Sequence, residues 1–157
     1  MSYEELWMKR LPGIVVIVFF SIACSAWFTP PQFADVPAFH SAAPQKGEKL
    51  PSILAGEELT GPSFKFGYQV QAYRLAAKIP NVIYQQPCFC FCDRSVGHKS
   101  LHSCFETEHG AHCGTCLQEL YYSYKMTKAG KTPAQIRAGI ENHEWEKIDL
   151  AHAATIN

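Results

Sequence analysis

The sequence carries no excess of either charge and no basic region. Its 157 residues hold 14 Lys and Arg against 14 Asp and Glu, so the formal net charge is zero. Proteins that bind nucleic acid usually present a basic face that neutralises phosphates, whereas the positive residues here are scattered along the chain. The sequence therefore predicts no nucleic-acid partner. Its length suits one domain with a modest core.

Several enzyme motifs are also missing. The segment 130–132 (Gly-Lys-Thr) lacks the spaced upstream glycine of a phosphate-binding loop. No serine stands in the strand-turn-helix context of a hydrolase nucleophile. A histidine precedes Cys113 instead of following Cys116, which excludes a c-type haem attachment motif. These absences set aside nucleotide hydrolysis, serine hydrolysis and covalent haem binding.

One long uncharged run is present near the N-terminus. Residues 11–28 carry no charge, and Lys9 and Arg10 stand directly before them. A basic start, an apolar stretch and small residues after it are typical of an export signal, and a membrane span needs about 20 apolar residues. We expect residues 1–28 to be a signal peptide or membrane anchor. Cleavage, lipid attachment at Cys24 and retention as an anchor all fit.

The protein is therefore expected to be exported, in a periplasmic or extracytoplasmic location, with the membrane as a partner through its N-terminal segment. Residues 29–64 are rich in Pro, Gly, Ser and Ala, which predicts an extended linker. Four apolar side chains near its end are expected to dock on the domain, with a short turn of helix: Leu50, Ile53, Leu54 and Leu59.

Residues 65–150 are predicted to form one mainly α domain of about three helices around an irregular segment rich in Cys and His. A first helix is expected to end before Pro80, with four residues on one face: Phe66, Val70, Tyr73 and Ala77. Residues 81–86 are β-branched and aromatic, which predicts a short strand or extended segment leading into the cysteines.

Two further helices follow the cysteines. The second is predicted from about Cys113 to Lys128, with Gly130 as its C-terminal stop. Thr132 is a predicted N-cap for the third, which has proline at its first position and glutamine at its third. Trp145 is expected to anchor the chain beyond it.

The main feature of the sequence is a dense group of cysteines and histidines. Residues 88–116 hold six of the seven cysteines and four of the seven histidines. They are Cys88, Cys90, Cys92, Cys104, Cys113 and Cys116, with His98, His102, His109 and His112. Such density indicates a metal site, a redox centre or a set of disulfides.

The first three cysteines alternate with Phe89 and Phe91. In an extended chain, residues two apart lie about 6.6 Å apart and point to the same side, whereas a disulfide needs Cβ atoms about 3.8 Å apart. Neighbours within the trio are therefore poor disulfide partners. If the segment is extended, three sulfurs converge on one side and the phenylalanines pack on the core.

The last two cysteines, Cys113 and Cys116, stand three residues apart at a predicted helix start. The unpaired amides and the dipole of a helix N-terminus stabilise a thiolate. Because the thiolate is both the metal-binding and the nucleophilic form, this pair suits zinc or copper(I) ligation and thiol exchange alike.

The sequence thus favours a clustered site for a copper or zinc ion. In this hypothesis the Cys88–Cys92 trio supplies one arm and the Cys113/Cys116 pair the other, with Cys104 and His98 completing or bracing the site. His109 is a further candidate beside a glycine. Two alternatives stay open. One is thiol-disulfide exchange, with Cys113 attacking and Cys116 resolving; the other is an exported structural or interaction protein stapled by three disulfides.

Three segments resemble a known family: KIPNVIYQQPCFCFCDRSVGHKSLHSCF, HGAHCGTC and GKTPAQIRAGI. Over residues 36–145 the chain resembles the bacterial CYCXC family of exported proteins and is similar to the PCYCGC-motif lipoproteins. The family is named for its motif and not for a reaction. The resemblance implies selenocysteine in some members at the position of Phe91, and phenylalanine excludes selenium chemistry here. Phe89 replaces the usual tyrosine.

A fainter likeness covers about thirty residues from Cys113 onward. A Cys-x-x-Cys pair, a helix, a Gly-Lys-Thr turn and a further helix resemble the thiol oxidoreductases of cytochrome c maturation. This likeness implies the exchange alternative and no particular substrate.

Overall fold

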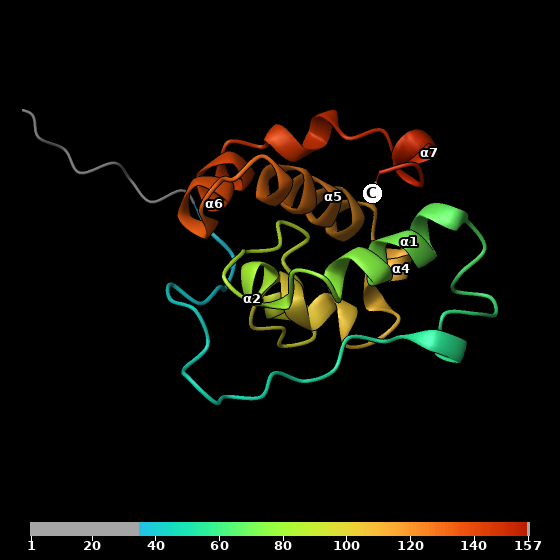
Figure 1. Ribbon diagram of the computed structural model, residues 1–157, viewed down its shortest axis with the longest axis horizontal. Coiled ribbons are helices and arrows are strands. Elements are labelled where there is room, and N and C mark those ends of the chain that lie inside the picture. Colours follow the sequence, from blue (N-terminus) through green and yellow to red (C-terminus); the bar gives the residue numbers. More distant parts are fainter. Residues whose placement is uncertain (1–34, 157) are drawn as a thin grey trace, which may run out of the picture. The chain divides into compact units, whose positions relative to one another are not determined.

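The computed structural model of the chain describes residues 35–156 (Figure 1). This part is mainly helical, as predicted, and contains no strand. Its α-helices are α1 (Gly67–Ala76), α2 (Pro80–Ile83), α3 (Cys92–Ser95), α4 (His109–His112), α5 (Gly114–Lys128), α6 (Pro133–Glu141) and α7 (Leu150–Ala153). Three 3-10 turns join them: η2 (Gly56–Glu58), η3 (Leu101–Phe105) and η4 (Glu144–Lys147).

The predicted membrane-targeting segment, residues 1–28, lies outside the described residues, as does the start of the predicted linker. Among the helices of the described part, none combines the length and the apolar character that a membrane span requires.

The longest described helix, α5, is the centre of the domain. Figure 1 shows it between α6 and the C-terminal turns on one side and α1, α2 and α4 on the other, and it contacts all of these elements. Its predicted inner residues are buried: Leu117, Leu120, Tyr121 and Tyr124. The helix begins directly after Cys113, its N-cap, and Gly130 follows its end with a left-handed φ of 77°. The second predicted helix is thereby confirmed.

Helix α6 also begins as predicted. The Thr132 hydroxyl accepts a hydrogen bond from the Gln135 amide at 3.3 Å, and the Gln135 side chain accepts one from the Thr132 amide at 3.0 Å. This reciprocal pair satisfies amides that have no partner inside the helix. Trp145 is buried beyond α6, again as predicted.

The predicted inner face of the first helix is wrong in part. Tyr73 is fully buried, but Phe66 is 54% exposed and Ala77 is exposed. Both lie just outside α1, since Phe66 is its N-cap and Ala77 its C-cap. Helix α1 packs against α5, α4 and η3. Its buried residues are Gln69, Ala72, Tyr73, Leu75 and Ala76.

The predicted strand at residues 81–86 is also wrong. Pro80 starts the short helix α2 at its first position, where the missing amide has no cost and the fixed φ is already helical. The Gln86 side chain then donates to the carbonyl of Val82 at 2.9 Å and to that of Pro133 at 3.2 Å. Pro80, which was predicted only to end the first helix, is thus also the first residue of the next.

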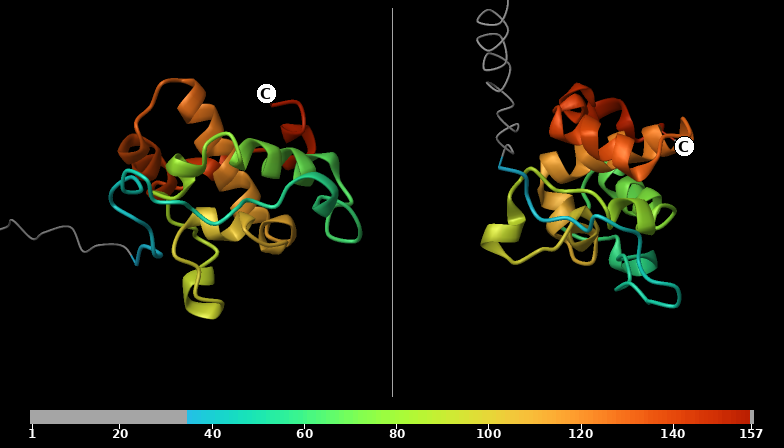
Figure 2. Two further views of the ribbon diagram at one scale, coloured as in Figure 1. Left: turned by 60° about the horizontal axis from the view of Figure 1, so that its bottom comes forward. Right: turned by 90° about the vertical axis from the view of Figure 1, so that its left-hand side faces the viewer.

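The segment predicted as irregular contains three short helical pieces, α3, η3 and α4, joined by turns and loops. Figure 2 shows α3 at the edge of the domain. Residues 35–64 run along the domain, and the predicted docking of their apolar side chains is confirmed: Ile53 and Leu54 pack against the core and Leu59 is buried. Contact begins earlier than predicted, because Pro37 is buried and the Ala38 amide donates to an Asp93 carboxylate oxygen at 3.0 Å.

Two of these short pieces, η3 and α4, approach each other closely at Gly110. A Cβ atom on Gly110 would lie 2.9 Å from the carbonyl oxygen of Cys104 and 3.0 Å from the ring of Phe105. Both distances are shorter than ordinary Cβ contacts. Only glycine therefore lets α4 lie this close to the turn that carries Cys104.

Replacing Gly110 with alanine is expected to lower the free energy of unfolding by about 1–3 kcal/mol, because the added methyl group has no space. A matched control is Gly114→Ala, whose added Cβ meets no atom within 4 Å. Denaturation followed by circular dichroism compares the two variants with wild type. Equal losses in both would contradict the close approach at Gly110.

Candidate metal centre

The fold brings together all six cysteines of residues 88–116. Cys88 and Cys90 lie in the turn after α2, and Cys92 is the first residue of α3. Cys104 comes from η3, whereas Cys113 and Cys116 come from the start of α5. Four of the six are almost fully buried, at 2% exposure or less: Cys88, Cys92, Cys104 and Cys116.

The three motif cysteines converge through a tight turn and not along a strand. The Phe91 amide donates to the carbonyl of Cys88 at 3.0 Å, and Phe91 itself has a left-handed φ of 56°. This turn places the sulfurs of Cys88, Cys90 and Cys92 within 4.8 Å of one another. The expected convergence is therefore present, but the extended geometry on which it was based is wrong.

The expected core position of the two phenylalanines also needs correction. Phe89 is half-buried against the edge of the core, and Phe91 is half-exposed. Their rings meet edge to face at 5.9 Å, and the guanidinium of Arg94 lies 4.2 Å from the ring of Phe91. Because the chain turns at Phe91, the two rings do not line one core-facing side as they would along a strand.

The sulfurs of the two arms are in direct contact. The Cys116 sulfur lies 3.3 Å from that of Cys88 and 3.6 Å from that of Cys90. The Cys92 and Cys104 sulfurs lie 3.5 Å apart. All six are free thiols, and no pair is at bonding distance.

Two histidines complete the cluster. Nδ1 of His98 lies 3.4 Å from the Cys104 sulfur, and Nε2 of His109 lies 3.8 Å from the Cys90 sulfur. Their rings are 4.7 Å apart. The other two histidines of the segment face elsewhere: His102 pairs with Glu106 at 2.8 Å, and His112 bonds the Ser63 hydroxyl at 2.9 Å.

The sequence placed His98 in the site and named His109 as a further candidate, and the structure brings both to the sulfurs. The signal for His109 was the segment HGAHC, in which a histidine four residues before Cys113 is followed by a glycine. That glycine, Gly110, permits the approach of α4 to η3. It is the structural reason why His109 reaches the sulfurs.

The spacing of these atoms fits a metal ion of the size of zinc. With zinc-sulfur bonds of about 2.3 Å, two sulfurs of a tetrahedral shell lie about 3.8 Å apart, and a sulfur and a nitrogen about 3.6 Å apart. The observed sulfur pairs, at 3.3–3.6 Å, and the sulfur-nitrogen pairs, at 3.4 and 3.8 Å, are close to these values.

The thiols influence one another's ionisation strongly. The Cys104 thiol is the largest influence that lowers the pKa of Cys90 and of Cys92, and it is also the largest that raises the pKa of Cys116. Without a cation, therefore, some sulfurs ionise at the expense of others that keep their protons. A metal ion replaces such protons, because only the thiolate is a good ligand.

A buried carboxyl lies behind the cluster. Glu119, one turn after Cys116 on α5, is fully buried and accepts a hydrogen bond from the Phe89 amide at 2.8 Å. Its other oxygen has no hydrogen-bond partner, and burial raises the pKa of this carboxyl to about 8. Sequence reasoning missed this residue. It fixes the backbone between the first two motif cysteines.

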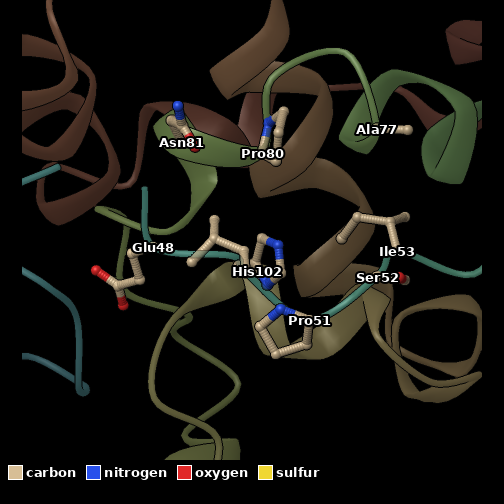
Figure 3. A pocket seen from close by; sticks show the side chains of 9 residues that line it. Glu48, Pro51, Ser52, Ile53, Ala77, Pro80, Asn81 and His102 are labelled. Carbon is tan, nitrogen blue, oxygen red and sulfur yellow. The ribbon is translucent and has the colours of Figure 1, made fainter. Parts of the chain in front are cut away.

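Space for an organic ligand lies away from the sulfurs. The cavity beside Cys88, Cys92 and His98 has no volume that a water molecule could fill. A pocket of about 400 Å³ instead opens between the segment 48–53 and α2, with His102 at its base (Figure 3). No cysteine lines it. This pocket is therefore separate from the cysteine cluster.

Comparison with known proteins agrees with the motif. Residues 60–149 match the family described as "protein of unknown function with PCYCGC motif". The chain belongs to this family. No curated protein and no solved structure matches it. The family motif has glycine where this chain has Phe91, the residue with a left-handed φ, so the turn itself explains why glycine suits this position.

This explanation can be tested with the pair Phe91→Gly and Phe91→Ala, both of which remove the ring. Only glycine adopts the left-handed conformation freely, so the Gly variant is expected to be more stable by about 0.5–1 kcal/mol. The same pair at Val96, which is exposed and has a φ of −128°, is expected to show the opposite order. Denaturant unfolding of reduced, metal-free protein measures both. If the same variant, Gly or Ala, were the more stable one at both positions, the explanation would be contradicted.

Proposed function

We propose that the chain binds a soft metal ion, copper(I) or zinc, at its cluster of six cysteines and two histidines. One observation carries the proposal: the ligand atoms meet in groups whose members all lie within 4.8 Å of one another, at a largely buried place. Thiolate and imidazole are the ligands that zinc and copper(I) prefer. When bound, such an ion would cross-link the motif turn, η3 and α5.

Burial favours holding an ion over catalysis at it. A catalytic zinc site keeps one position open for water or substrate, whereas here Cys104 and Cys116 are fully buried and the cavity beside Cys88 and Cys92 has no volume that a water molecule could fill. Cys90, Cys113 and His109 are only half-buried. They form the side from which an ion would enter.

The proposed location is outside the cytoplasm, with the chain tethered to the membrane. This part of the proposal is supported by the basic residues and the uncharged run within residues 1–28. Free thiols tend to oxidise in such compartments. A bound metal would protect them, which makes the location and the metal mutually consistent.

Thiol-disulfide exchange at Cys113 and Cys116 is a second candidate. It is favoured by the position of Cys113 as N-cap of α5, where its sulfur accepts a hydrogen bond from the Cys116 amide at 3.4 Å. Against it, although the Cys116 thiol lowers the pKa of Cys113, the Cys90 thiol and burial outweigh this effect and raise the pKa to about 11. Such a thiol is a weak nucleophile near neutral pH.

The two candidates differ in metal content. Protein purified without chelator is expected to contain at least one zinc or copper ion per chain by elemental mass spectrometry. The ligating thiolates are shielded in the native protein. Four or more thiols that do not react before denaturation should therefore react after denaturation in chelator. Absence of both metal and thiols would sink the proposal and indicate disulfides.

A separate assay tests exchange. If Cys113 attacks and Cys116 resolves, Cys116→Ser is expected to accumulate a mixed disulfide with a model substrate and Cys113→Ser is not. Gel mobility without reductant measures this. A metal-free protein with free thiols and this trapping pattern would replace metal binding by exchange as the function.

A further inference from the structure

We infer that the cluster holds two metal ions in adjoining half-sites and that Cys88 is the eighth ligand, which completes the half-site that His109 does not. This inference rests on the proposed metal binding and adds the number of ions and the role of each ligand. It follows from how the eight ligand residues are grouped in space.

Two groups of four ligands are distinguishable. Half-site A consists of Cys90, His109, Cys113 and Cys116, whose ligand atoms all lie within 4.8 Å of one another. Half-site B consists of Cys92, His98, Cys104 and, again, His109, with the same limit. Half-site A is built on the start of α5, whereas half-site B is built on α3, η3 and the loop between them. Apart from His109 the two share no residue.

A single tetrahedral ion would use too few of these ligands. It takes four, and it would leave the other four, buried thiols among them, with no metal. Two ions would engage the whole set. They would also offset more of the negative charge of the thiolates, which is costly to bury without a counter-charge.

The shared histidine requires one additional ligand. In ordinary zinc sites an imidazole gives one nitrogen to one ion, so His109 can complete one half-site and not both. Cys88 supplies what the other lacks. Its sulfur lies within 4.8 Å of those of Cys90 and Cys92, and likewise of those of Cys104 and Cys116.

Cys88 therefore borders half-site A through Cys90 and Cys116 and half-site B through Cys92 and Cys104. Its sulfur is 3.3 Å from that of Cys116 and 3.4 Å from that of Cys90. Its sulfur is therefore within reach of either half-site as a fourth ligand. At this boundary, and 2% exposed, it is placed to fill the half-site that His109 leaves open.

The number of ions is tested by titrating the reduced, metal-free full chain with zinc under native mass spectrometry. Wild type is expected to reach two zinc ions per chain. Cys113→Ser, in half-site A, and Cys104→Ser, in half-site B, are each expected to keep one, and the double variant none. His112→Ala is the matched control, because this neighbouring histidine faces Ser63, and it is expected to keep two.

The outcomes separate this inference from the proposed function. One zinc ion in wild type, lost in both single variants, would overturn the two-ion inference and leave metal binding intact. No zinc in wild type would overturn both. Circular dichroism in chelator checks the fold of each variant. If Cys104→Ser does not fold, His98→Ala removes a half-exposed ligand of half-site B alone and is expected to keep one ion.

The role of Cys88 is tested by loading the chain with cadmium-113, which takes the place of zinc on thiolates. Two resonances are expected in wild type. In Cys88→Ser one of them is expected to move to lower frequency or to disappear, because one shell loses a thiolate, whereas in His112→Ala both are expected to persist. Two unchanged resonances in Cys88→Ser would overturn the role of Cys88 as a ligand.

Discussion

The contact between the Cys116 sulfur and the sulfurs of Cys88 and Cys90 joins the central helix α5 to the motif that defines the family. Cys116 cannot move independently, since α5 is held by the buried side chains of Leu120 and Tyr121. The motif turn, by contrast, has few backbone hydrogen bonds of its own. Four of the six sulfurs are also part of the hydrophobic core, so the site and the core are one structure. Binding of the proposed ion would therefore be coupled to folding.

The rest of the domain positions the ligands that the motif does not supply. Tyr73 of α1 donates a hydrogen bond to the Thr107 carbonyl at 2.6 Å and accepts one from the Ala111 amide at 3.1 Å. Gln69 donates to the Ala111 carbonyl at 2.8 Å. These bonds hold both ends of α4, which carries His109. A helix more than thirty residues away in sequence thus orients a candidate metal ligand.

Sequence reasoning succeeded where the information was local. The capping box at Thr132 and the N-cap position of Cys113 depend on residues three apart, and both are present in the structure. It failed where tertiary partners decide. The inner face of α1 is set by the elements packed against it, and no local signal placed the buried Glu119 behind the cluster. Gathering of the six cysteines was predictable from density alone, whereas their division into two groups was not.

Charge balance explains the place of Glu119. A carboxylate beside a group of thiolates would add repulsion inside the core, where charges are poorly screened. Burial raises the pKa of Glu119 to about 8, so near neutral pH this carboxyl is mostly protonated and adds little charge. Glu119 still accepts a hydrogen bond from the Phe89 amide, which would otherwise have no partner between Cys88 and Cys90. The negative charge of the cluster then resides on the sulfurs, where a soft cation can neutralise it directly.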